Sequence, residues 1–342
     1  MSARLGVAPV FSAWVWPFCG RLVQGQHVRG RVIRGTSVLL LTSFFLPGCE
    51  RAKSSAANAV SGSARAAVPA ASGAALTWDD SAAGPVLIVD GSNESEAAIV
   101  FPHYTDSTLA DVSRLDTGIV RRGHVDLFSR GGAAGQADVI PTSAGTLGGD
   151  CTAWPTARVR SLDRGAGGVP AAWTAGFLAG NAVSLPMDSI QTLSPVDSAR
   201  RAADVARVAA ALPNDTSATF RDLPFVVRSA GRIVLDGGTE AILAEIVRQL
   251  NQEANPQEEH IFLIAERDSA NGKPTAAYFE RVSGAEDDVE SSEVLAVVRL
   301  GPRRVPTIVL SRDYGDGGAY TLIERTGRGQ WGVRWNSAYT GC

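Results

Sequence analysis

The sequence contains few of the residues from which metal and catalytic centres are built. Only four of its 342 residues are histidines and four are cysteines. Downstream of residue 49 the histidines are His103, His124 and His260, and no two of them stand at the short spacing of helical or finger-type metal sites. Neither glycine-rich segment, at 131–135 or 164–168, opens an apolar helix that could hold a phosphate. The sequence therefore predicts no metal and no cofactor.

Long apolar runs and an excess of basic residues are also missing. The longest apolar run has about a dozen residues, whereas a membrane-spanning helix needs roughly 20. The first 48 residues hold five arginines and no acidic residue, so the remaining chain has 27 basic against 35 acidic residues and a net charge of −8. Nucleic-acid binding needs a basic surface against the phosphates. We therefore expect neither a permanent transmembrane helix nor a nucleic-acid partner.

Residues 29–49 have the order of a signal peptide, in which arginines precede an apolar run, small residues and a cysteine. Leu46, Pro47, Gly48 and Cys49 resemble the lipobox of bacterial lipoproteins. In that family the cysteine sulfur takes a diacylglycerol, the peptide bond before it is cut, and the new amine is acylated. The resemblance implies that Cys49 is the lipidated first residue of the mature chain and that its acyl chains hold the protein on a membrane.

Glu50 and the length of the leader add two expectations. In the family, an aspartate after the cysteine signals inner-membrane retention in enteric bacteria. Glu50 stands there instead, which implies the outer membrane, on its periplasmic or its surface face. The 48 residues before Cys49 are long for such a signal, so we infer that residues 1–27 are not translated. The alternative, a buried strand at 38–46 with Cys49 as a core thiol, leaves the basic flank unexplained.

The remaining cysteines predict one disulfide bond. Cys19 lies upstream of the expected cut and Cys49 is used by the lipid, which leaves Cys151 and Cys342 in a compartment that oxidises thiols. A bond between these two would tie down the last residue of the chain. Two free thiols or an intermolecular bond are the alternatives.

The fold class predicted for the mature chain is mainly β, with antiparallel sheets or a meander. Short apolar runs bounded by Gly, Asp, Ser and Pro recur from residue 76 onward, and this is the pattern of strands and turns. Segment 49–75 has almost no large apolar residue and is expected to be a flexible tether. The predicted organisation is a leader and signal peptide at 1–48, the lipidated cysteine and tether at 49–75, an N-terminal β domain at 76–190, and a helix with a C-terminal antiparallel β domain at 191–342.

One helix is clearly predicted, at about 195–212. Ser194 can cap it, Pro195 suits its first position, and Asp197 completes a capping box. Apolar residues then recur at helical spacing, and Pro213 stops the pattern. Segment 239–253 is ambiguous, because its apolar residues fit a helix while the DGG turn before it suits a hairpin; we favour a strand.

Two groups of residues are candidates for function. His124 and Asp126 could form part of a catalytic triad with Ser143, although the surroundings of this serine do not match a nucleophile elbow. Trp331 and Trp335 alternate with other residues, so one strand face is expected to carry both indoles. That face is interpreted as core, and the alternative is an aromatic binding face that stacks on a sugar or peptide.

These observations favour an envelope-anchored lipoprotein that acts as a non-enzymatic binding or structural module. Besides the membrane that holds its lipid, its partner would be an envelope protein, a peptide or a glycan. The alternative is an extracytoplasmic enzyme, such as a hydrolase, whose residues are dispersed through loops. A deep pocket where the triad candidates converge would favour the enzyme, whereas an aromatic patch without one would favour binding.

Overall fold

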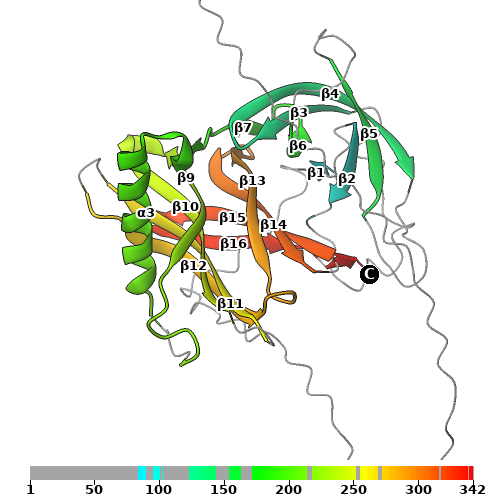
Figure 1. Cartoon of the computed structure of the whole chain (residues 1–342). Coiled ribbons are helices and arrows are strands. Elements are labelled where there is room, and N and C mark those ends of the chain that lie inside the picture. Colours follow the sequence, from blue (N-terminus) through cyan, green and yellow to red (C-terminus); the bar gives the residue numbers. More distant parts are fainter. Residues whose placement is uncertain are drawn as a thin grey trace, which may run out of the picture. The chain divides into compact units, whose positions relative to one another are not determined.

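The computed structural model consists mainly of antiparallel strands, as the sequence predicts (Figure 1). Cys49, Cys151 and Cys342 lie outside the residues that the structure describes, as does the tether at 49–75, so the lipidation and the disulfide bond stay predictions. None of the described helices is long and apolar enough to cross a membrane. The described residues are 84–89, 95–100, 102, 123–143, 154–162, 172–213, 218–251, 255–268, 272–315, 317–337 and 339–341, without the side chains of 141–143.

The first six strands close into a barrel in the order β1-β2-β5-β4-β3-β6. Along β3 the side chains of Val125 and Leu127 are fully buried while His124 is exposed, which is the alternation of a strand with one face on a core. Closure leaves no free edge in such a sheet. The strands are β1 (Val86–Val89), β2 (Glu96–Val100), β3 (His124–Ser129), β4 (Gly132–Ser143), β5 (Thr156–Ser161) and β6 (Ala175–Leu178).

Two further sheets pack face to face as a sandwich. A cluster of buried apolar residues lies between them, with Leu243 and Phe262 from one sheet against Val297, Leu310 and Ile323 from the other. The five-stranded sheet has the order β12-β11-β10-β9-β8, with β8 (Asp188–Ser189), β9 (Val226–Val234), β10 (Glu240–Leu250), β11 (Gln257–Arg267) and β12 (Thr275–Ala285). The six-stranded sheet has the order β16-β15-β14-β13-β7, with β7 (Ala182–Ser184), β13 (Ser291–Leu300), β14 (Val305–Tyr314), β15 (Gly317–Gly327) and β16 (Gln330–Asn336), while β17 (Thr340–Gly341) pairs with β15.

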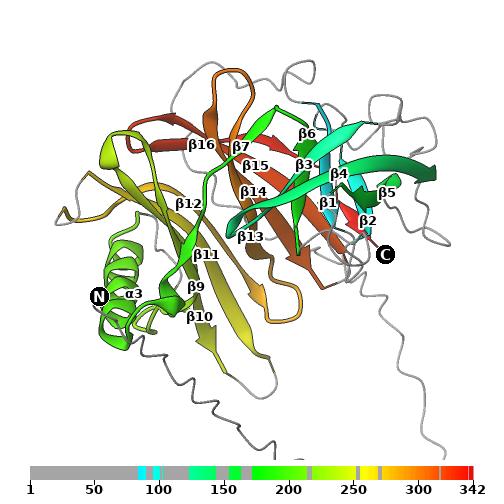
Figure 2. The same ribbon diagram turned by 90° about the horizontal axis from the view of Figure 1, so that it is seen from above.

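The outer faces of the sandwich are covered on both sides. Helix α3 (Pro195–Ala210) packs on the five-stranded sheet through a second apolar cluster, which includes Val205 and Ile246 (Figure 2). The barrel interior is continuous with the outer face of the six-stranded sheet, because Ala296 and Val309 belong to the same cluster as the barrel residues. The central strands β10 and β13 are therefore buried on two faces along most of their length, and apolar residues predominate in them.

The helix prediction is confirmed in its start and in its buried face. Ser194 Oγ accepts a hydrogen bond from the Asp197 amide at 3.2 Å and donates one to the Asp197 carboxylate at 2.8 Å. Val205, Val208 and Ala209 are the buried residues of the helix. Segment 239–253 contains strand β10, so the preference for a strand is also confirmed. Its helix-like pattern arises because both faces of β10 are buried, one in each apolar cluster.

The pairing of strand β16 differs from the expectation for its two tryptophans. Trp331 pairs with Arg325 and Val333 pairs with Ile323, but Trp335 pairs with Leu322, so one residue of β16 is bulged between the last two pairs. A bulge of one residue moves the following side chains to the opposite face of a sheet. Trp331 is consequently buried between the two sheets, while Trp335 is partly buried against the barrel side. The expectation that a single strand face carries both indoles is therefore wrong.

We expect Trp331→Ala to cost about 3–5 kcal/mol of unfolding free energy, as truncation of a buried aromatic side chain does. The matched control is Trp335→Ala, which should cost less because this indole is only partly buried. Urea denaturation monitored by circular dichroism measures both. Equal costs for the two variants would contradict the placement of Trp331 in the inner core.

Candidate functional site

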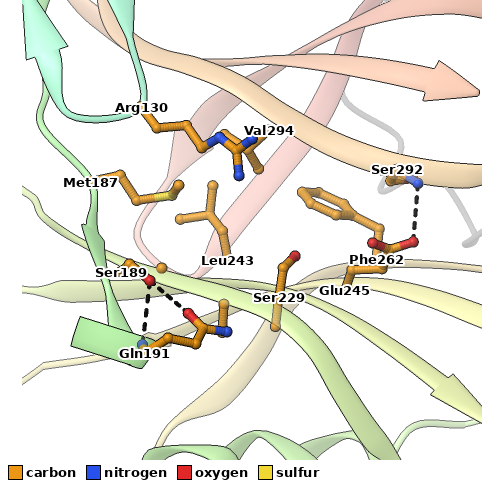
Figure 3. A pocket seen from close by; sticks show the side chains of 13 residues that line it. Arg130, Met187, Ser189, Gln191, Ser229, Leu243, Glu245, Phe262, Ser292 and Val294 are labelled. Carbon is orange, nitrogen blue, oxygen red and sulfur yellow. Dashed lines mark hydrogen bonds between the residues drawn. The ribbon is translucent and has the colours of Figure 1, made fainter. Parts of the chain in front are cut away.

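A cavity of about 100 Å³ opens between the two sheets of the sandwich (Figure 3). Its floor is apolar, with Leu243 and Phe262, and a carboxylate, Glu245, stands at one side. Arg130, from the turn between β3 and β4, extends over it beside Met187 and Val294. The complete lining is Arg130, Met187, Ser189, Gln191, Ser229, Ala230, Gly231, Leu243, Ala244, Glu245, Phe262, Ser292 and Val294.

The cavity lies where the two sheets leave neighbouring edges incompletely paired. Strand β7 covers only 298–300 of β13, and β8 covers only 231–232 of β9. In the part of the chain that the structure describes, no strand pairs with the outer edges of 226–230 and 291–294. Residues 182–189, expected in the N-terminal domain, thus form a strap that runs from one sheet to the other beside the cavity.

Glycine at position 231 allows the strap to lie close to β9. A Cβ atom at Gly231 would approach the Met187 sulfur to 2.4 Å, which is closer than real contacts allow. The Met187 amide donates a hydrogen bond to the Arg130 carbonyl at 2.9 Å, and the Leu185 amide donates one to the Val297 carbonyl at 3.1 Å. The strap is therefore fastened to the barrel and to β13, and it fixes one border of the cavity.

Next to the cavity, a buried histidine lies between two carboxylates. His260 Nδ1 is 3.2 Å from Glu245 Oε1, and His260 Nε2 is 2.6 Å from Glu258 Oε2. Gln249 also donates a hydrogen bond to Glu258, and the side chain of Arg228 lies 4.0 Å from Glu245. Because carboxylates only accept hydrogen bonds, a ring that donates from both nitrogens satisfies both partners.

The two neighbouring carboxylates determine the direction in which the pKa of His260 is shifted. Burial alone would lower the pKa of His260, but the hydrogen bonds and charges of Glu245 and Glu258 outweigh it and raise the pKa above its ordinary value. Burial would likewise raise the pKa of Glu258, but hydrogen bonds from His260 and Gln249 bring it below its ordinary value. Both directions favour a protonated His260 ring beside an ionised Glu258.

A second polar cluster connects the two sheets next to the cavity. Arg312, on β14, is 2% exposed and forms an ion pair with Glu280 of β12 in the opposite sheet. It also lies 3.1 Å from Glu290 and donates to Ser292 Oγ at 2.7 Å. Burial would lower the pKa of Arg312, but the charges of Glu280 and Glu290 raise it. Its guanidinium lies 5.8 Å from the centre of the Phe262 ring, whose side chain lines the cavity.

The residues singled out in the sequence do not form this site. His124 Nδ1 lies 2.8 Å from Asp138, and Asp126 accepts hydrogen bonds from Gln136 and from the Gly180 amide. The side chain of Ser143 lies outside the described residues. Trp331 donates its indole N–H to Glu266 at 2.7 Å, in the core.

Glu245 and its partner His260 are not among the residues singled out from the sequence, although two features of the sequence point to them. Glu245 interrupts the apolar segment AILAEIV at 241–247. His260 begins the segment HIFLIAE at 260–266, and Glu258 lies two residues before it, which is the spacing of one strand face. A charged residue inside an apolar strand requires a buried partner, so each is a marker of a polar cluster. These signals do not tell which strands bring the partners together, because strand pairing depends on residues that lie far apart in the sequence.

Among the described residues, no three His, Cys, Asp or Glu side chains are arranged to hold a metal ion. The ring of His260 separates Glu245 from Glu258, so their oxygens do not converge on one point. Comparison of the chain with protein-family models, curated proteins and solved structures found no match.

The raised pKa of His260 predicts the pH dependence of stability. Its contribution is fully present below the pKa of an unfolded histidine, about 6.5, and is lost as the pH rises through the higher folded value. The unfolding free energy should therefore fall on the alkaline side of about pH 6.5. His260→Gln should cost about 1–3 kcal/mol at that pH and remove this alkaline slope.

Urea unfolding at a series of pH values measures the effect. The control is His124→Gln, because the side chain of His124 is 67% exposed and pairs only with Asp138 at the surface. An alkaline slope of the unfolding free energy that persists in His260→Gln and disappears in His124→Gln would contradict the prediction, because the slope would then not come from His260.

Proposed function

We propose that the protein is an envelope-anchored lipoprotein whose folded body is a non-enzymatic binding module, with the cavity between β9 and β13 as its ligand site. The lipobox resemblance at Cys49 supports the anchor. The cavity supports binding, because it combines an apolar floor with a few convergent polar groups, as small-ligand sites do.

One observation carries the choice of binding over catalysis. Both ring nitrogens of His260 are engaged by carboxylates, so neither is available to exchange a proton with a ligand in the cavity. Glu245, which reaches the cavity, is held from behind by His260 and by the Ser292 amide at 3.3 Å. These groups are fixed in position before any ligand arrives, which reduces the ordering cost of binding.

The first test concerns the anchor. Cys49→Ala should move the protein from the membrane to the soluble fraction, because no acyl chain can then be attached. Ser54→Ala, in the tether that follows Cys49, is the matched control and should leave the protein on the membrane. Membrane association that survives Cys49→Ala would contradict the anchor.

The released Cys49→Ala protein serves to test the binding role. Amino acids, short peptides and oligosaccharides are screened for a rise in the unfolding temperature, which any ligand of the folded state produces. Ser229→Leu places a larger side chain in the cavity and should abolish the rise for each ligand found. Ligands that stabilise both proteins equally would bind elsewhere, and the cavity would then not be the site.

A further inference from the structure

Glu245 presents one unused oxygen to the cavity. Its side chain is 9% exposed, and its Oε1 atom accounts for the contacts with His260, Ser292 and Arg228. Its Oε2 atom has no partner within the described part of the chain. Figure 3 shows this second oxygen on the cavity side, away from the bond to Ser292. This oxygen is open to the cavity, so a ligand that donates a hydrogen bond can reach it.

Ser229 adds a second acceptor beside it. Ser229 and Glu245 are direct partners in the pairing of β9 with β10, so their side chains stand on the same face of the sheet. In Figure 3 the Ser229 hydroxyl points into the cavity. A hydroxyl both accepts and donates, so this pair can hold a donor between a charged and a neutral oxygen.

The arrangement of the two acceptors, Glu245 Oε2 and the Ser229 hydroxyl, favours one kind of cation over another. A guanidinium is planar and is best held by both oxygens of a carboxylate, but Glu245 Oε1 is already occupied. An ammonium group is a compact charge with three donors, which one carboxylate oxygen and one hydroxyl can satisfy in part. Leu243, Phe262 and Val294 offer apolar surface to the methylene groups behind it.

We propose that the cavity binds a primary ammonium group carried on an aliphatic chain, with Glu245 as its counter-ion. This inference rests on the proposed binding role of the cavity and names its ligand chemistry. Arg130, above the cavity, is paired with Glu293 on its outer side. That pairing offsets its charge at the entrance.

The cavity wall keeps an excess of carboxylate charge that attracts the cation. Glu245 and Glu258 share the single His260 ring. The charge of Arg228 is screened because its side chain is 58% exposed.

The experiment titrates the released Cys49→Ala protein by calorimetry with two sources of the same group. One probe is the tripeptide Gly-Lys-Gly with both ends blocked, and the other is n-butylammonium. If blocked Gly-Lys-Gly binds and n-butylammonium does not, the ligand is a peptide. If both bind, the cavity also accepts free amines. Either result supports the inference. Blocked peptides with acetyl-lysine, norleucine or arginine in the same position should bind at least about tenfold more weakly.

The variants locate the cation. Glu245→Gln should weaken binding of the lysine peptide by about tenfold or more, and Ser229→Ala by a smaller factor. Asp268→Asn is the matched control, because it removes a carboxylate that pairs with Arg328 at the surface and does not line the cavity. It should leave the affinity within about twofold, which is under 0.5 kcal/mol by the usual conversion.

Three results would overturn the inference. The first is that neither amine binds at millimolar concentration, and the second is equal affinity for the lysine and norleucine peptides. The third is equal weakening by Glu245→Gln and Asp268→Asn in protein that is folded by circular dichroism. If another ligand class found in the screen still depends on Ser229, the binding role stands while the ammonium assignment fails.

Discussion

Buried polar contacts join the two sheets of the sandwich, and they determine how the sheets meet. Arg312 on β14 reaches Glu280 on β12, and Arg325 on β15 reaches Glu266 on β11. The Ser292 amide, on β13, reaches the carboxylate of Glu245 on β10. Removing one partner of a buried ion pair costs about 3–5 kcal/mol, so a shift of one sheet against the other is strongly disfavoured. The apolar cluster between the sheets lacks this directionality, because hydrophobic burial depends on area.

The cavity is a consequence of the same arrangement. Where the inner faces are apolar, as at Leu310 and Ile323, side chains of the two sheets fill the space between them. At Glu245 the inner face carries a carboxylate whose partners lie behind it and beside it, and the strap at 182–189 closes only one border. The result is a small site whose wall is rigid at Glu245, because this carboxylate is held by His260 and by the Ser292 amide.

Local features of the fold could be predicted from the sequence, and non-local ones could not. The Ser194 cap and Pro213 mark the helix because capping and helix breaking depend on adjacent residues. The closure of the barrel and the order of the strands depend on contacts between distant segments. The bulge in β16 is equally invisible, since one extra residue in the pairing moves Trp335 to the other face without altering the sequence pattern. Glu245 was recognisable only as a charge in an apolar strand, and its partners His260 and Ser292 come from two other strands.

His260 holds Glu245 in place at the cavity, and a double-mutant cycle on the unfolding free energy measures the coupling between the two side chains. Glu245→Gln, His260→Gln and the double variant are compared with the unmodified protein by urea denaturation at neutral pH. We expect a coupling free energy within about 0.5–3 kcal/mol, because the two side chains are buried and in direct contact. Costs that add within about 0.3–0.5 kcal/mol would show that the two residues act independently and that His260 does not hold Glu245 in place.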